Sequence, residues 1–320
     1  MIVVLDAYTL CGEHRDVLEH ILRPYGQVMI YDRTLPAQVV ERAKGAEYVF
    51  TNKVVMDAAV MAALPDLRFI GVLATGYNVV DIEAARARGI VVANVPAYST
   101  ESVAQMVFAH LLNITQRVGH YADEVRSGAW SGQPDFSYRN TRLMELWGKT
   151  IGLVGFGNTG QATARIALGF GMKVRVFTSK AQQQLPRGVA KATLEDVFSG
   201  SDVVSLHCPL TRENSRMVNR DLLATMKPGA ILINTARGGL VDDEALADAL
   251  RSGRLMAAGL DVLTEEPPAP GHPLVGLENC FITSHIAWAT EEAIARLVAI
   301  TAQNLQTAAE GHPANNVAAR

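Results

Sequence analysis

The sequence predicts an α/β protein built of two doubly wound parallel sheets, and three observations lead to this prediction. Short, uninterrupted apolar runs recur along the 320 residues, as expected for strands that are covered on both faces. Stretches with helical periodicity separate these runs, which is the pattern of βαβ units with right-handed crossovers. Of all residues, 49% are hydrophobic but only 6% are aromatic. The length itself predicts two domains.

The apolar runs fall into two sets, which we assign to two sheets. Strands of the first sheet are expected at residues 2–5, 28–31, 48–51, 69–73 and 90–94. Strands of the second sheet are expected at residues 151–156, 173–177, 203–208, 230–235, 257–262 and 280–284. Each run is followed by residues with helical spacing, so every strand pair within a set is expected to be parallel.

Three segments outside the strands have their own patterns. Apolar residues at helical spacing predict one long helix over residues 101–128. Residues 123–146, which are rich in Gly, Trp, Tyr, Asn and Arg, predict an irregular connection. An Ala-rich pattern predicts a last helix over residues 291–309, which Gly311 can terminate.

Composition excludes several classes of protein. The net charge of −3, without a basic stripe, argues against nucleic acid or an anionic membrane as a partner. The three cysteines, Cys11, Cys208 and Cys280, lie far apart and support neither a disulfide framework nor a zinc site, so no metal is expected. Residues 1–6 read as a first strand rather than a signal peptide. With no apolar run of about 18 residues, we expect a cytoplasmic protein.

A glycine motif follows the first run of the second set. It consists of Gly155, Phe156, Gly157, Asn158, Thr159 and Gly160, between a strand and a predicted helix. The first glycine permits a tight turn, the second lets the backbone approach a pyrophosphate, and the third allows close packing of helix on strand. Phosphates bind the free N–H groups of such a helix end. The motif favours dinucleotide binding over a purely structural turn, although methyltransferases that bind adenosylmethionine use related loops.

The residues after the next predicted strand bear on the choice of cofactor. An NAD-selective site usually carries an acidic residue here to bind the ribose 2′-OH. This sequence has Thr178, Ser179 and Lys180 instead, and no carboxylate between Glu145 and Glu195. Hydroxyl and cationic donors suit a 2′-phosphate, so the sequence favours NADP over NAD. The alternative is an ordinary polar loop that binds the ribose loosely.

Polar residues at later strand ends are candidates for chemistry on a hydroxy or keto acid. Arg237 offers a planar cation for a carboxylate, and His285 offers a proton donor whose basicity a carboxylate such as Glu266 can raise. Each has a structural alternative: a surface arginine, a solvated loop acid and a packed histidine. Glu265 competes with Glu266, and by spacing alone His285 stands only slightly ahead of His207.

The sequence resembles the D-isomer-specific 2-hydroxyacid dehydrogenases over essentially its whole length. The matching segments, in order, are residues 73–81, the glycine motif, and residues 207–211, 234–238, 259–267 and 284–288. The resemblance implies that His285 is the proton donor, that Glu266 is its charge partner, and that Arg237 binds the substrate carboxylate and carbonyl. It makes His207 a wall residue of the site.

The resemblance also implies the binding residues and the domains. Backbone N–H groups around Ala74, Thr75 and Gly76 are expected to hold the substrate carboxylate. Dinucleotide contacts are implied for the glycine motif, the 178–180 segment, His207, Cys208, Pro209, Thr235, Ala236 and Asp261. A flavodoxin-like substrate-binding lobe is expected at residues 1–99 and 286–320, and a Rossmann lobe for the dinucleotide at 100–285, with a cleft between them.

Within the family, residues 74–78, 103–105 and 285–288 look most like glycerate dehydrogenases, which are also called hydroxypyruvate reductases. This implies reduction of a small 2-keto acid, with hydroxypyruvate or glyoxylate favoured, by a homodimer. Trp288 is then expected to line the substrate pocket, its alternative being a packed aromatic. A nucleotide-sensing binding protein of the same fold, such as a corepressor, is the other function that the sequence leaves open.

Overall fold

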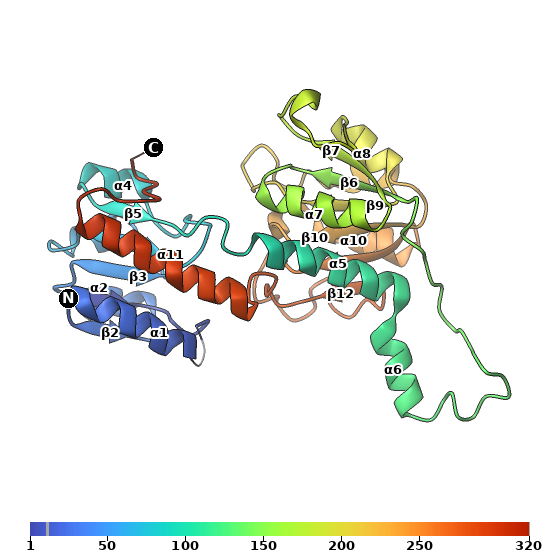
Figure 1. Cartoon of the computed structure of the whole chain (residues 1–320), viewed down its shortest axis with the longest axis horizontal. Helices are drawn as coiled ribbons and strands as arrows, with labels where there is room; N and C mark the ends of the chain where they lie inside the picture. The colour runs from blue at the N-terminus through green and yellow to red at the C-terminus, as the bar shows by residue number, and fades with distance from the viewer. Residues whose placement is uncertain (11–12, 320) are drawn as a thin grey trace. The chain divides into compact units, whose positions relative to one another are not determined.

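The structure is a computed structural model, and it describes residues 1–10 and 13–319. Cys11 lies outside the described residues. The chain divides into two compact units, Met1–Ser99 with Ala289–Arg320 and Thr100–Trp288. Each unit is built on its own sheet (Figure 1), so the predicted fold class is confirmed.

The first unit forms, within the described residues, a five-stranded parallel sheet in the order β2-β1-β3-β4-β5. Its strands are β1 (Ile2–Val4), β2 (Val28–Ile30), β3 (Tyr48–Thr51), β4 (Phe69–Val72) and β5 (Val91–Ala93). This is the flavodoxin-like order. The central strands are buried because helices cover both faces of the sheet.

The helices of the first unit come from both ends of the chain. They are α1 (Glu13–Leu22), α2 (Val39–Ala43), α3 (Ala58–Ala62), α4 (Ile82–Ala87) and α11 (Glu291–Ala309). Helix α11 has the bounds that the sequence predicts, and it begins where the Thr290 side chain accepts a hydrogen bond from the N–H of Ala293. Gly311, with φ of 84°, follows its end. Helix α11 returns to this unit and contacts α1.

The second unit, which is described throughout, forms a seven-stranded parallel sheet in the order β12-β11-β10-β9-β6-β7-β8. Its strands are β6 (Thr150–Val154), β7 (Lys173–Phe177), β8 (Val189–Lys191), β9 (Val203–Leu206), β10 (Ala230–Asn234), β11 (Leu255–Leu260) and β12 (Cys280–Ile282). From β8 across to β11 the strand order is that of the Rossmann fold, and β12 extends it. Strand β8 was not predicted, because this edge strand has only three residues, two of them exposed.

The second unit, which is described throughout, has six α-helices. They are α5 (Thr100–Gln116), α6 (Val118–Arg126), α7 (Asn158–Gly169), α8 (Leu194–Gly200), α9 (Arg220–Thr225) and α10 (Asp243–Arg251). Helix α7 begins at Asn158, inside the glycine motif. No helix among the described residues combines the length and apolar character that crossing a bilayer requires.

The prediction of one long helix over residues 101–128 is wrong. The helix breaks at Arg117, which has a left-handed φ of 53° between α5 and α6. The guanidinium of Arg117 lies over the ring of Phe281, 5.1 Å from its centroid. Helix α6 therefore leaves α5 in a new direction, and the irregular connection follows it (Figure 1).

The second passage of the chain between the units also differs from expectation. It lies between Trp288 and Ala289, three residues after the expected boundary at 285/286. Residues 286 and 287 stay with the second unit because their N–H groups donate to the carboxylate of Asp261, at 3.0 and 2.8 Å.

Candidate active site

Three neighbouring strands end at the candidate site. In the sheet, β10, β11 and β12 lie side by side and run parallel. Arg237 follows β10, Glu266 lies in the loop after β11, and His285 follows β12. Because the carboxyl ends of parallel strands meet at one edge of the sheet, the fold gathers three residues that are far apart in sequence.

His285 and Glu266 form a close polar contact at this edge. Nδ1 of His285 lies 2.6 Å from Oε2 of Glu266, and the two side chains are 30% and 36% exposed. The other carboxylate oxygen of Glu266 accepts a hydrogen bond of 3.0 Å from the N–H of Leu263. The carboxylate is thus held from two sides. With Nδ1 facing Glu266, Nε2 of His285 is the ring nitrogen that faces away from the carboxylate.

A tight turn after β10 presents Arg237. The side chain of Asn234 builds this turn, since it accepts from the N–H of Ala236 and donates to the carbonyl of Arg237. The Arg237 side chain is exposed, and its Nη1 donates to the carbonyl of Ala236 at 2.7 Å. Among the described residues, no carboxylate forms an ion pair with this guanidinium.

Gly238 brings the Arg237 turn against the Glu266 loop. A Cβ at this position would lie 1.9 Å from the carbonyl carbon of Leu263 and 2.4 Å from the nitrogen of Thr264. Only a glycine allows backbones this close. The structure therefore places His285 and Glu266 in direct contact. The close backbone approach at Gly238 places the Arg237 turn against the loop that carries Glu266.

The other histidine that the sequence left open has a different environment. Nε2 of His207 lies 2.9 Å from Oγ of Ser205, and burial lowers the pKa of this imidazole to about 4. His207 is therefore neutral near pH 7 and has no carboxylate partner of the kind that His285 has. The neighbouring thiol of Cys208 is also largely buried, which raises its pKa.

The three glycines of the nucleotide motif meet the requirements expected of them. Gly155 has a φ of 102°, and a Cβ there would lie 2.7 Å from the carbonyl of His207. A Cβ on Gly160 would lie 2.5 Å from the carbonyl oxygen of Gly155, so this glycine permits the helix to pack on the turn. At Gly157, which precedes α7, a Cβ would meet nothing within 4 Å. The backbone is therefore open where a pyrophosphate is expected.

The residues around this motif fit a nicotinamide dinucleotide. The hydroxyl of Thr235, at the end of β10, is buried and has no hydrogen-bond partner within the part of the chain that the structure describes. Lys180 lies with its Nζ 5.6 Å from the centroid of the Phe156 ring, and its carbonyl accepts a hydrogen bond from Lys191. Thr178 accepts from the N–H of Lys180. An open helix end, an orphaned hydroxyl and a cationic strand end are what a phosphate-rich cofactor requires.

Asp261 is a buried residue, 1% exposed, at the end of β11. Its two carboxylate oxygens accept hydrogen bonds from Thr283 and from the N–H groups of Ile286 and Ala287. A cofactor contact for Asp261, like those of Pro209 and Ala236, stays a prediction. Trp288 donates from its indole nitrogen to the carbonyl of His285 at 2.8 Å, so its ring is fixed beside the histidine turn.

The remaining predicted residues lie in the first unit, in the turn after β4. Thr75 donates from its hydroxyl to the carbonyl of Val95, and Asn94 donates to the carbonyl of Thr75. In the part of the chain that the structure describes, the N–H groups of Thr75 and Gly76 donate to no acceptor. The turn is thus braced by side chains while its donors stay available, which suits the expected role with Ala74 in carboxylate binding.

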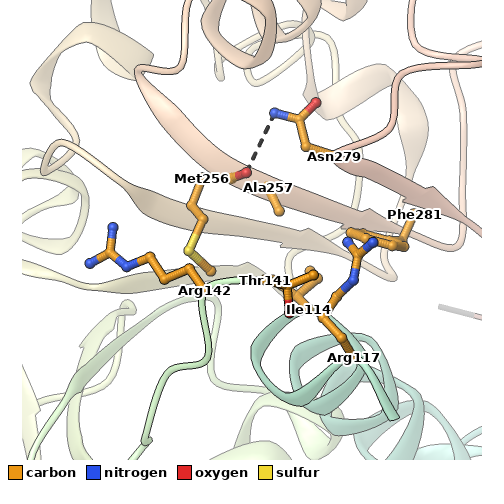
Figure 2. Close-up of a pocket in the computed structure, with 8 residues that line it drawn as sticks. All are labelled: Ile114, Arg117, Thr141, Arg142, Met256, Ala257, Asn279 and Phe281. Atoms are coloured by element: carbon orange, nitrogen blue, oxygen red, sulfur yellow. Dashed lines mark hydrogen bonds between the residues drawn. The ribbon is translucent and has the colours of Figure 1, made fainter. Parts of the chain in front are cut away.

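A separate hollow of about 200 Å³ lies at the amino-terminal ends of β11 and β12, whereas the candidate site lies at their carboxyl ends (Figure 2). Arg117 and Phe281 form one wall, and Asn279 donates to the carbonyl of Met256 beside it. None of the predicted site residues lines this hollow.

Sequence reasoning did not single out Asn234, Thr283 or His110 as site residues. Asn234 and Thr283 each stand at the carboxyl end of a strand, and this position is the feature of the sequence that could have indicated a site residue. His110 sits in an apolar stretch of α5 and resembles a core residue, so its hydrogen bond of 3.1 Å to Thr283 had no signal in the sequence.

Comparison with known proteins identifies the family of the chain. Residues 108–287 match the family model of the D-isomer specific 2-hydroxyacid dehydrogenase, NAD binding domain. A hydroxypyruvate reductase of Blautia hydrogenotrophica is 43% identical over 320 residues, covering 99% of each chain. A glycerate dehydrogenase of Methylorubrum extorquens is 40% identical and covers 89% of each chain. The crystal structure of the TT0316 protein from Thermus thermophilus has a TM-score of 0.88, at 40% identity and 99% coverage of both chains.

These similarities decide among the functions that the sequence left open. The relatives are enzymes, so they give no support to the corepressor alternative, and the matched family excludes a methyltransferase. The chain belongs to the D-isomer-specific 2-hydroxyacid dehydrogenase family and is an NAD(P)-dependent oxidoreductase that acts on D-2-hydroxy acids.

Proposed function

We propose that this protein reduces a small 2-keto acid, with hydroxypyruvate or glyoxylate favoured, and that Arg237, Glu266 and His285 carry the reaction. The observation that supports this most directly is the 2.6 Å contact between His285 and Glu266 beside the Arg237 turn. A histidine paired with a carboxylate is a proton donor near neutral pH. A nearby guanidinium without an ion-pair partner among the described residues can bind a carboxylate through two parallel hydrogen bonds.

Each side chain has a stated task in this proposal. Arg237 binds the substrate carboxylate and stabilises the negative charge that develops on the carbonyl oxygen. Nε2 of His285 gives its proton to that oxygen, and Glu266, its charge partner at Nδ1, orients the imidazole. The N–H of Leu263 in turn keeps Glu266 in place. A bound nicotinamide supplies the hydride that reaches the carbonyl carbon.

The substrate preference rests on similarity and on one residue. The hydroxypyruvate reductase at 43% identity and the glycerate dehydrogenase at 40% support a three-carbon acid. The fixed ring of Trp288, adjacent to His285 through the indole hydrogen bond, supports an aromatic wall for a small substituent. One hydroxymethyl group changes binding by about 1–3 kcal/mol in such a pocket, so a panel of acids can resolve the preference.

We infer a preference for NADP over NAD. Thr178, Ser179 and Lys180 stand at the end of β7, where a carboxylate would select NAD. Lys191 lies beside them, with its ammonium group 2.8 Å from the carbonyl of Lys180. Two cations and two hydroxyls favour a 2′-phosphate at this edge of the site.

We also infer a homodimer, which is the expectation for the family. Helix α6 and the segment after it project from the second unit (Figure 1), and they carry Phe136, which is 91% exposed, and Trp147, which is 74% exposed. Large exposed aromatics of this kind support a protein interface. A cytoplasmic location and the lack of nucleic-acid or membrane partners stay predictions from composition.

Steady-state reduction of glyoxylate, hydroxypyruvate, pyruvate and phenylpyruvate with each reduced cofactor tests the function. We expect turnover with the two-carbon or three-carbon acids, and a loss of about 10²–10⁴-fold in His285→Ala. Cofactor affinity, measured by nucleotide fluorescence, is expected to stay near that of the wild type. His312→Gln serves as a histidine control far along the chain from the site. Cofactor binding without turnover of any acid by the wild type would favour a nucleotide-sensing protein instead.

A further inference from the structure

His285 stands in an unusual backbone conformation. Its φ of 57° places it in the left-handed region, which histidine seldom adopts. A residue keeps such a conformation only where its surroundings impose it, and these positions are frequent at functional sites. The turn must therefore be held by neighbours whose identity the structure can reveal.

Asp261 fixes the turn at residues 285–287 through two backbone hydrogen bonds. Its Oδ2 accepts a hydrogen bond of 2.8 Å from the N–H of Ala287, and its Oδ1 accepts one of 3.0 Å from the N–H of Ile286. The two residues that follow His285 are thus fixed to a carboxylate that is 1% exposed. A rotation of Asp261 would release both N–H groups and, with them, the left-handed turn.

Asp261 is held in place by Thr283, which follows β12, and Thr283 is in turn held by a residue of helix α5. The hydroxyl of Thr283 donates to Oδ1 of Asp261 at 2.5 Å, and Nε2 of His110 lies 3.1 Å from the same hydroxyl. Because the hydroxyl proton goes to the carboxylate, His110 must donate from Nε2. Burial lowers the pKa of His110 although Asp261 raises it, so the ring is a neutral Nε2–H donor.

The packing around His110 is built for this contact. A Cβ on Gly259 would lie 2.7 Å from Cβ and 2.9 Å from Cγ of His110, so only a glycine in β11 leaves room for the imidazole. Two turns earlier on α5, the hydroxyl of Ser102 donates to the carbonyl of Ala287. Helix α5 therefore contacts the residues on both sides of His285, through Ser102 at Ala287 and through His110 at Thr283.

We propose that His110 and Thr283 are positioning residues for proton transfer at His285: through Asp261 they fix the backbone of residues 285–287 and so direct the imidazole at Glu266. Neither residue touches the reacting atoms. The proposal deepens the proposed function and rests on His285 being the proton donor. It predicts that loss of the Thr283 hydroxyl reduces the chemical step although the catalytic set is intact.

Matched substitutions at two positions test this. Thr283→Val keeps the shape but removes the hydroxyl, and Thr283→Ser keeps the hydroxyl. His110→Phe removes the donor, and His110→Gln replaces it with an amide Nε2–H. Because a displacement of about 1 Å costs about 10²-fold, we expect Thr283→Val and His110→Phe to lower kcat by about 10–10²-fold. The serine and glutamine variants are expected to recover most of that loss.

Two further readouts separate positioning from general loosening of the core. The affinity for 2′-phospho-ADP-ribose, which lacks the nicotinamide, is expected to stay near wild type in all four variants, because the glycine motif follows β6, three strands away from β11 and Asp261. In the crystal structure of Thr283→Val, residue 285 is expected to leave the left-handed region that it occupies in the wild type. As a control, Thr301→Val removes another buried hydroxyl, one that has no hydrogen-bond partner among the described residues, and it should change neither kcat nor this turn.

The outcomes of the test distinguish the two proposals. Turnover by Thr283→Val at the wild-type rate overturns the positioning role and leaves the proposed function intact. An inactive wild type overturns the proposed function. In that case the crystal structure of Thr283→Val still decides the inference: we expect residue 285 to leave the left-handed region, and an unchanged turn refutes it.

Discussion

Replacing Gly238 by alanine is a sharp test of how the site is assembled. The added Cβ would stand 1.9 Å from the carbonyl carbon of Leu263, whereas ordinary contact begins at 3.4 Å. The Arg237 turn and the Glu266 loop must therefore separate by about 1.5 Å. Both partners are backbone, so no side-chain rotation can relieve the overlap.

The consequence for catalysis follows from what Leu263 holds. The N–H of Leu263 donates to the Glu266 carboxylate, which faces His285. Gly238, which presses against Leu263, directly follows Arg237. A misplacement of about 1 Å costs about 10²-fold in rate, which corresponds to about 2.7 kcal/mol of activation free energy. We expect kcat to fall by at least that factor and the free energy of unfolding to fall by about 1–3 kcal/mol, as for other overpacked positions.

The assay is oxidation of the reduced nucleotide in the presence of keto acid, with urea denaturation alongside. Gly169→Ala is the matched control, because its Cβ would meet nothing within 4 Å and its φ is not positive. The control should keep full activity and equal or slightly higher stability. A folded Gly238→Ala enzyme with kcat close to that of the wild type would show that this close approach does not set the catalytic geometry.

Three further predictions concern the cofactor, pH and assembly. Lys180→Asp should raise the KM for NADPH much more than that for NADH, and equal changes would remove the argument for a 2′-phosphate site. The pKa of His207 is about 4 in the folded protein against 6.5 for a free imidazole, so its contribution to stability is complete above pH 6.5 and is lost as the pH falls towards 4. From pH 7 to pH 5 the wild type should therefore lose about 2 kcal/mol more unfolding free energy than His207→Gln, and equal losses in urea titrations would contradict this. Phe136→Asp should shift the protein from dimer towards monomer in sedimentation, and an unchanged mass would place the interface elsewhere.

The sequence predicts those features that local patterns determine. Uninterrupted apolar runs mark strands covered on both faces, and they locate all but one strand. Helix α11 has the expected bounds because a capping threonine, an apolar stripe and a glycine after its end all lie within it or beside it. The glycine motif is equally local, since Gly155 and Gly160 act on each other within one turn.

Features that depend on distant partners could not be predicted in this way. The break at Arg117 involves Phe281, far along the chain, and neither proline nor glycine occupies the break itself. The left-handed turn at His285 depends on Asp261, and that in turn on a histidine of α5. Periodicity carries no information on these contacts, because it reports which face of an element is buried and not which residue covers it.

The close approach at Gly238 also divides the Glu266 loop into two parts with different tolerance for change. Leu263 is buried and pinned by the neighbouring turn, whereas residues 267–271 are exposed. Doubling the length of a flexible loop costs only about 0.6 kcal/mol in chain entropy. Insertions or a reporter peptide at this tip should therefore be accepted with little loss of activity, which makes it a practical place to attach a label close to the reaction centre.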